Sequence, residues 1–110
     1  MAKAEIYSGI CGFTTRVTAV KGAGRGREME VAVRLDSECP SWQKAAEEIN
    51  SLKPFEELFS LRPGGRLFEA AGRHVRHAAC PVPAGILKAV EVAAGLALPR
   101  DVVIKVSAED

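Results

Sequence analysis

The sequence predicts an α+β fold in which an antiparallel sheet of three to four strands carries helices packed on one face. Early segments alternate apolar and polar residues as strands do, and later segments repeat apolar residues at helical spacing. Strands that cluster before helices are typical of this class. The chain of 110 residues, of which 47% are hydrophobic, is expected to form a single domain, residues 1–110, with its own core.

Three segments before residue 40 are expected to supply strands. Residues 14–20 alternate, and residues 28–35 alternate more clearly because one face carries Met29, Val31, Val33 and Leu35. The glycine-rich basic stretch between them, residues 21–27, predicts a flexible hairpin tip. Residues 5–10 are expected to add a short strand or to continue into the first one.

The apolar spacing becomes helical after Cys39-Pro40. Residues 42–52 present one apolar face and predict a helix, and Pro54 is expected to open a short second helix. Residues 62–65 predict a turn, and residues 67–76 suit a third helix.

A fourth helix is expected at residues 83–98, where an apolar stripe runs up to Pro99. A last strand is expected at residues 102–106, because Val102, Ile104 and Val106 share one face. The fourth helix is rich in alanine and carries Gly95, which permits close packing. A homodimer through this helix is therefore one expectation, and the sequence names no other protein partner.

The charge balance argues against partners that are selected by bulk charge. The formal net charge is +1, which makes nucleic acid an unlikely partner. No segment has the ~20 consecutive apolar residues that would span a membrane, and no signal-peptide pattern follows Met1. The expected location is the cytoplasm, where thiols stay reduced.

The three cysteines are the sharpest chemical feature. Cys11, Cys39 and Cys80 are odd in number, so they cannot all pair within the chain. Cys80 stands where the fourth helix begins, and the positive end of a helix favours a thiolate. Cys80 is therefore a candidate catalytic thiol, and Cys39 repeats the Cys-Pro arrangement before another helix.

A metal site is the alternative that we rank narrowly first from the sequence. Cys11, Cys39, His77 and Cys80 form a Cys₃His set that would suit zinc or an iron–sulfur cluster. The pair of His77 and Cys80 has chelate spacing, whereas the other two residues are distant in sequence. A third reading, in which the cysteines only pack in the core, stays open.

Other polar residues carry blander expectations. His74 and His77 are expected on one helix face, as half of a metal site or as a solvated pair. The acidic pairs Glu47-Glu48 and Glu56-Glu57 are expected on solvated helix faces.

Two resemblances add to these observations. The run Cys80-Pro81-Val82-Pro83, with the helix and strand expected after it, resembles the Cys-Pro-x-Pro element of TusA-type sulfur carriers. In that family the cysteine carries a persulfide, which implies a sulfur-bearing role for Cys80. The TusA element lies near the start of a shorter chain, so only Cys80 carries over.

Over its whole length the chain resembles a family of small uncharacterised prokaryotic domains that contain cysteines. The residues that carry this resemblance are Ile10-Cys11-Gly12-Phe13-Thr14, Ser37-Glu38-Cys39-Pro40 and the stretch from His77 to Pro99. The resemblance implies the same three cysteines and no stated activity. Whether the protein is an enzyme stays open at this point.

Overall fold

The computed structural model describes residues 1–59 and 65–109, and it confirms the predicted fold class. Within these residues four antiparallel strands form an open sheet in the order β1-β2-β3-β4, with bounds Ala2–Tyr7, Thr14–Lys21, Val31–Ser37 and Ser51–Leu52. The same residues form four α-helices, α1 Pro40–Ala46, α2 Pro54–Glu57, α3 Arg66–His74 and α4 Val82–Ala93. A short 3₁₀ turn at Gly26–Glu28 forms the hairpin tip between β2 and β3.

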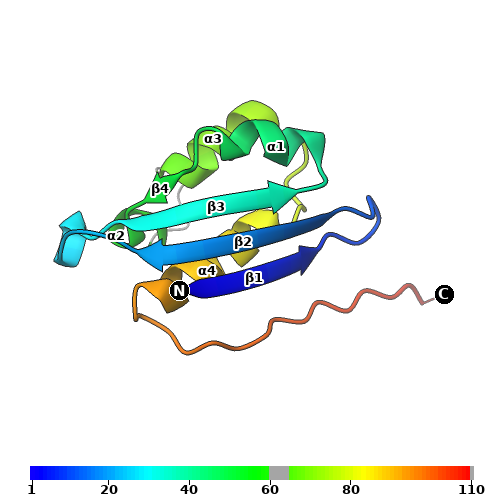
Figure 1. The fold of residues 1–110 in the computed structure, drawn as a ribbon. Helices are drawn as coiled ribbons and strands as arrows, with labels where there is room; N and C mark the ends of the chain where they lie inside the picture. The colour runs from blue at the N-terminus through cyan, green and yellow to red at the C-terminus, as the bar shows by residue number, and fades with distance from the viewer. Residues whose placement is uncertain (60–64, 110) are drawn as a thin grey trace.

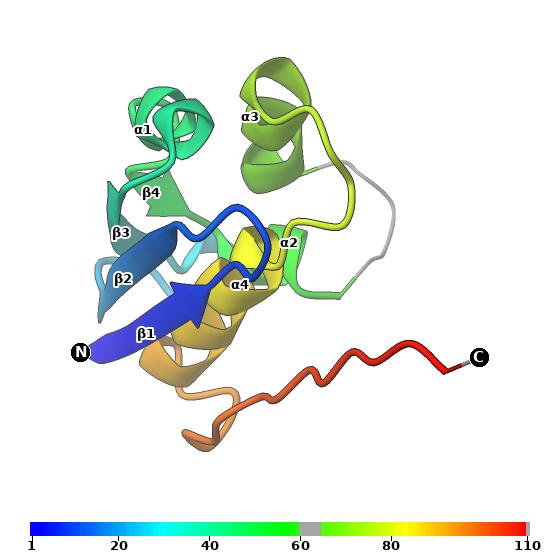
Figure 2. The ribbon, with the colours of Figure 1, turned by 90° about the vertical axis from the view of Figure 1, so that its right-hand side faces the viewer.

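The sheet has one buried face and one open face. Val17 of β2 is 1% exposed and Val31 of β3 is fully buried, whereas their neighbours Arg16 and Ala32 are exposed. The buried face packs against α4, which lies behind β1 and β2 (Figure 1). Figure 2 shows α4 and α3 on the same side of the sheet. This alternation is what a half-buried antiparallel sheet requires.

The first helix is shorter than the spacing predicted. It ends at Ala46, and the next backbone N–H groups donate three residues back, from Glu48 to Ala45 and from Ile49 to Ala46. This tighter turn keeps Ile49 in the core and lets the chain return to the sheet. Leu52 therefore lies in β4 and not in a helix, which corrects the helix expected over residues 42–52.

The fourth helix also ends early, at Ala93 instead of Leu98. Gly95 adopts a φ of +78°, and the N–H of Leu96 donates to the carbonyl of Glu91 at 2.9 Å. These are the features of a Schellman motif, in which glycine accepts the left-handed conformation that ends a helix. Gly95 thus terminates α4.

The last strand that the sequence predicted is absent from the described sheet. Residues 96–109 run clear of the sheet in Figures 1 and 2, and their large apolar side chains are exposed. The third helix stops at His74, so His77 follows it in irregular chain and does not share a helix face with His74. The turn expected at residues 62–65 lies almost wholly outside the described residues.

Candidate functional site

The three segments that carry the cysteines meet at one end of the sheet. Cys11 lies in the turn that follows β1, and Cys39 comes two residues after the end of β3. Cys80 precedes α4, whose first turn packs on the end of β1, since a Cβ on Gly85 would lie 2.2 Å from Cγ1 of Ile6. Figure 2 looks onto this end, with the β1–β2 turn passing in front of α4. The fold therefore brings both Cys-Pro helix starts to the same end of the sheet.

The Cys80 thiol accepts a hydrogen bond from a buried tryptophan. The indole Nε1 of Trp42 lies 3.3 Å from Cys80 Sγ, and Trp42 is 1% exposed. Cys80 is half-buried and stands just before Pro81, the N-cap residue of the 12-residue helix α4. The Cys80 sulfur therefore receives an N–H donor and lies beside the positive end of a helix.

A buried hydroxyl network fixes the helix that carries Trp42. The side-chain oxygens of Thr15 and Ser37 lie 2.7 Å apart between β2 and β3. Ser37 Oγ also accepts the backbone N–H of Cys39 at 3.1 Å, and the Ser37 carbonyl accepts from Gln43 Nε2 at 2.9 Å. These bonds tie the first turn of α1 to the sheet, and they thereby set the position of the indole.

The four residues proposed as metal ligands are placed differently from one another. Cys11 and His77 are exposed in a turn and in irregular chain, whereas Cys39 and Cys80 are half-buried at helix starts. Across residues 1–59 and 65–109, no group of three or more His, Cys, Asp or Glu side chains is placed to hold a metal ion. The zinc or iron–sulfur hypothesis therefore finds no supporting geometry here and stays a prediction from the sequence.

A basic hollow of about 200 Å³ lies beside the start of α1. Its lining residues are Pro40, Ser41, Lys44, Arg73, His74 and Arg76. Glu48 partly neutralises it, because its carboxylate accepts from Arg73 Nε at 2.9 Å and contacts His74 Nε2. The bond from Arg73, followed by that from His74, lowers the pKa of Glu48. Glu48 follows the end of α1 by two residues and links it to α3, so its side chain is half-buried and does not lie on a solvated helix face.

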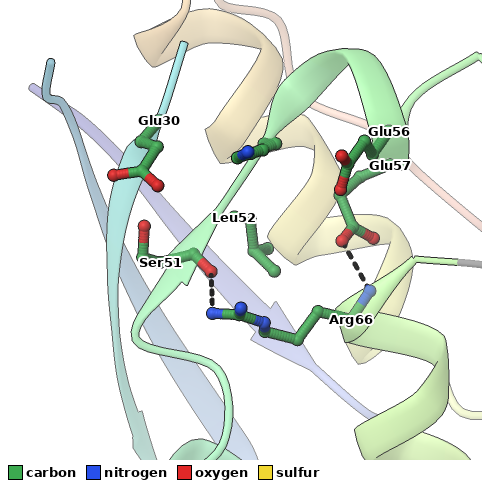
Figure 3. A pocket seen from close by; sticks show the side chains of 7 residues that line it. Glu30, Ser51, Leu52, Glu56, Glu57 and Arg66 are labelled. Atoms are coloured by element: carbon green, nitrogen blue, oxygen red, sulfur yellow. Dashed lines mark hydrogen bonds between the residues drawn. The ribbon is translucent and has the colours of Figure 1, made fainter. Parts of the chain in front are cut away.

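A second hollow, of about 130 Å³, lies between β4 and the start of α3 (Figure 3). Glu57 Oε1 accepts the backbone N–H of Arg66 at 2.8 Å, and Arg66 Nη1 donates to the carbonyl of Ser51 at 3.3 Å. Glu57 is 3% exposed, so the expectation of a solvated face is wrong for this residue. Burial raises the pKa of Glu57, and the backbone N–H groups of Arg66 and Leu67 offset part of this effect. The carboxylate serves as a cap for α3.

The hydrogen bond from Trp42 to Cys80 was not predicted from the sequence, which placed Trp42 only on the apolar face of a helix. The available signal was that a buried indole N–H usually finds an acceptor. Trp42 is the one tryptophan of the chain, and it stands two residues after Cys39-Pro40. A cysteine sulfur at the same end of the sheet was therefore a reasonable acceptor for its indole N–H.

Comparison with known proteins gives a family and no activity. A family model described as "Family of unknown function (DUF6951)" matches residues 2–106, which include all three cysteines. No curated protein and no solved structure matches the chain. Among the residues that the structure describes, no helix is long and apolar enough to cross a membrane.

Proposed function

Since the chain belongs to DUF6951, a family of unknown function, we propose its function from its own residues: Cys80 is a sulfur-carrying thiol. It accepts the terminal sulfur of a persulfide and passes that sulfur on to a second thiol. The observation that carries this proposal is the hydrogen bond from the buried Trp42 indole to Cys80 Sγ.

Four features support Cys80 as the sulfur-carrying thiol. It has an N–H donor 3.3 Å from its sulfur, and it stands before a helix of 12 residues, whereas Cys39 precedes a helix of seven. It remains partly exposed, so a small donor can reach it. The Cys-Pro-Val-Pro run from Cys80 to Pro83 resembles the element that bears the persulfide in TusA-type carriers. A reducing location such as the cytoplasm would keep the thiol free.

The transfer needs no external oxidant. The Cys80 thiolate attacks the outer sulfur of a donor persulfide, and the donor's S–S bond breaks as a new S–S bond forms on Cys80 Sγ. The donor leaves as its thiolate, and Cys80 holds the outer sulfur as a persulfide. The donor sulfur is reduced as the Cys80 sulfur is oxidised, so electrons balance. The second transfer repeats the exchange on an acceptor thiolate.

Loading with inorganic polysulfide under anaerobic conditions tests the proposal. Intact-mass analysis of the reduced protein is expected to show a gain of one sulfur atom, and peptide mapping is expected to place it on Cys80. Cys80→Ser is expected to abolish the gain. Cys11→Ser and Cys39→Ser serve as matched controls and are expected to retain it.

Two results would overturn the proposal. The first is sulfur that loads chiefly on Cys11, which would show that exposure alone decides reactivity. The second is stoichiometric zinc or iron in protein purified without chelator and lost in Cys80→Ser, which would show that Cys80 serves as a metal ligand.

A further inference from the structure

We propose that residues 102–107 form a fifth strand on the free edge of β1 in a second copy of this chain, so that two copies exchange these segments. This interaction surface is independent of the chemistry at Cys80.

The segment has the composition and shape of a strand without a sheet. Val102, Ile104 and Val106 share one face and are 60%, 71% and 88% exposed, and Val103 on the other face is 71% exposed. β-branched residues in alternation favour extended, paired backbone. So many exposed apolar side chains in one short segment indicate a surface that a partner covers.

The edge of β1 offers what this segment lacks. The strand order places β1 at one side of the sheet, where the described residues pair it with β2 alone. The outward backbone N–H and C=O groups of an edge strand are a template for another strand. Helix α4 packs beneath β1 and keeps partly buried apolar side chains at Leu87, Val92 and Ala93. An added strand would extend the apolar layer above that helix.

The direction and length of the segment favour a second copy as its partner. The chain leaves α4 near the beginning of β1 and then runs clear of its own sheet (Figures 1 and 2). Extended residues rise ~3.3 Å each, so residues 98–106 span roughly 30 Å, whereas the six residues of β1 span roughly 20 Å. The segment is thus long enough to reach and cover another β1. In a two-fold dimer the exchange is reciprocal, so both edges and both segments are satisfied.

Charge and face alternation select a register. An antiparallel pairing that sets Lys105 opposite Glu5 also sets Ile104 opposite Ile6, whose side chain points into the core. The same register places Val103 opposite Tyr7 on the open face of the sheet. Opposite charges and apolar pairs across strands both stabilise such a pairing.

Sedimentation of the full chain over a tenfold concentration range tests the exchange. The wild-type chain is expected to sediment as a dimer, with slow amide exchange at residues 102–106. Ile104→Lys is expected to raise the dimer dissociation constant at least tenfold. Asp101→Lys is the matched control, because it adds the same side chain outside the pairing, and it is expected to leave the dimer intact.

A charge reversal keeps the test independent of folding defects. Glu5→Lys is expected to weaken the dimer, and Glu5→Lys combined with Lys105→Glu is expected to restore it. A monomeric wild-type chain would overturn the proposal, whether its residues 102–106 exchange rapidly or are protected by pairing with their own β1. A dimer that survives Ile104→Lys would overturn it as well, because the copies would then meet through another surface.

Discussion

The indole of Trp42 and the sulfur of Cys80 are the smallest unit on which the proposed function depends. Each residue alone has an ordinary explanation, since tryptophans fill cores and half-buried cysteines pack beside them. Their contact at 3.3 Å gives the pair a chemical meaning, because the indole N–H points at an atom that can hold negative charge. The contact between these two residues is therefore what distinguishes the proposed reactive thiol from a cysteine that only packs in the core.

Trp42→Phe is expected to slow alkylation of Cys80 by about two- to fivefold at neutral pH. The substitution removes the N–H donor that contacts the sulfur, an interaction worth about 1 kcal/mol, which corresponds to about fivefold in a rate constant. Peptide-resolved mass spectrometry after iodoacetamide treatment measures the rate. The exposed Cys11 serves as the control in the same sample. A Cys80 rate that stays unchanged or rises would contradict the expectation.

Glu57→Gln is expected to change how stability depends on pH. Burial raises the pKa of Glu57 above its ordinary value of 4.5, so the folded state holds this proton more tightly than the unfolded state does. The wild-type chain therefore loses stability, relative to the Glu57→Gln variant, as pH rises from 4.5 through the raised pKa.

Urea titrations of both proteins at several pH values measure this difference. A difference in unfolding free energy between the two proteins that does not depend on pH would report altered hydrogen bonding to the backbone N–H of Arg66. A difference that changes with pH reports the titration of Glu57. The unfolding free energy of Glu57→Gln minus that of the wild type is expected to rise with pH. A fall of this difference with rising pH would contradict the assigned sign.

Only part of the candidate site could be proposed from the sequence. Cys80 was proposed because a cysteine before Pro-Val-Pro forms a local pattern. Its partner Trp42 lies 38 residues away, and no spacing rule links them. Glu57 was misplaced for the same reason, since its partner Arg66 belongs to the next helix and only the fold brings them together.

At the scale of elements, types were predicted better than ends. Alternation over residues 14–20 and 28–35 identified β2 and β3, apolar spacing identified α1, α3 and α4, and Pro54 identified α2. The ends of α1 and α4 were set by backbone hydrogen bonds that the apolar pattern does not encode. The two-residue strand β4 was missed because Leu52 continues the helical spacing of the residues before it.

Gly85→Ala tests the contact between α4 and β1. A Cβ at this position would lie 2.2 Å from Cγ1 and 2.5 Å from Cδ1 of Ile6. Overpacking costs about 1–3 kcal/mol, and the helix propensity of alanine returns up to ~1 kcal/mol, so we expect a net loss of about 1 kcal/mol in the free energy of unfolding.

Gly72→Ala in α3 is the matched control, because nothing lies within 4 Å of its Cβ position. It is expected to stabilise the protein by up to ~1 kcal/mol. Thermal and urea denaturation measure both variants. Equal stabilisation by the two substitutions would show that α4 does not approach Ile6 closely.

At the scale of the whole molecule, the sequence predicted the α+β class and the layer of helices on one face. It also predicted strand character at residues 102–106, which the structure leaves outside the sheet and exposed. The strand pattern and the exposure of this segment agree if it pairs with a strand of another copy. The pattern of one chain predicts a strand but does not show which chain that strand pairs with. The cysteines converge on one end of the sheet, yet their surroundings differ.

Competition between the cysteines of the wild-type chain tests the central claim most directly. The folded, reduced protein is treated with a trace of iodoacetamide at neutral pH, and labelled peptides are counted over time. We predict that Cys80 is labelled before Cys11, although Cys11 is exposed and Cys80 is half-buried. Labelling of Cys11 first, with Cys80 reacting only after unfolding, would contradict the claim that Cys80 is the functional thiol.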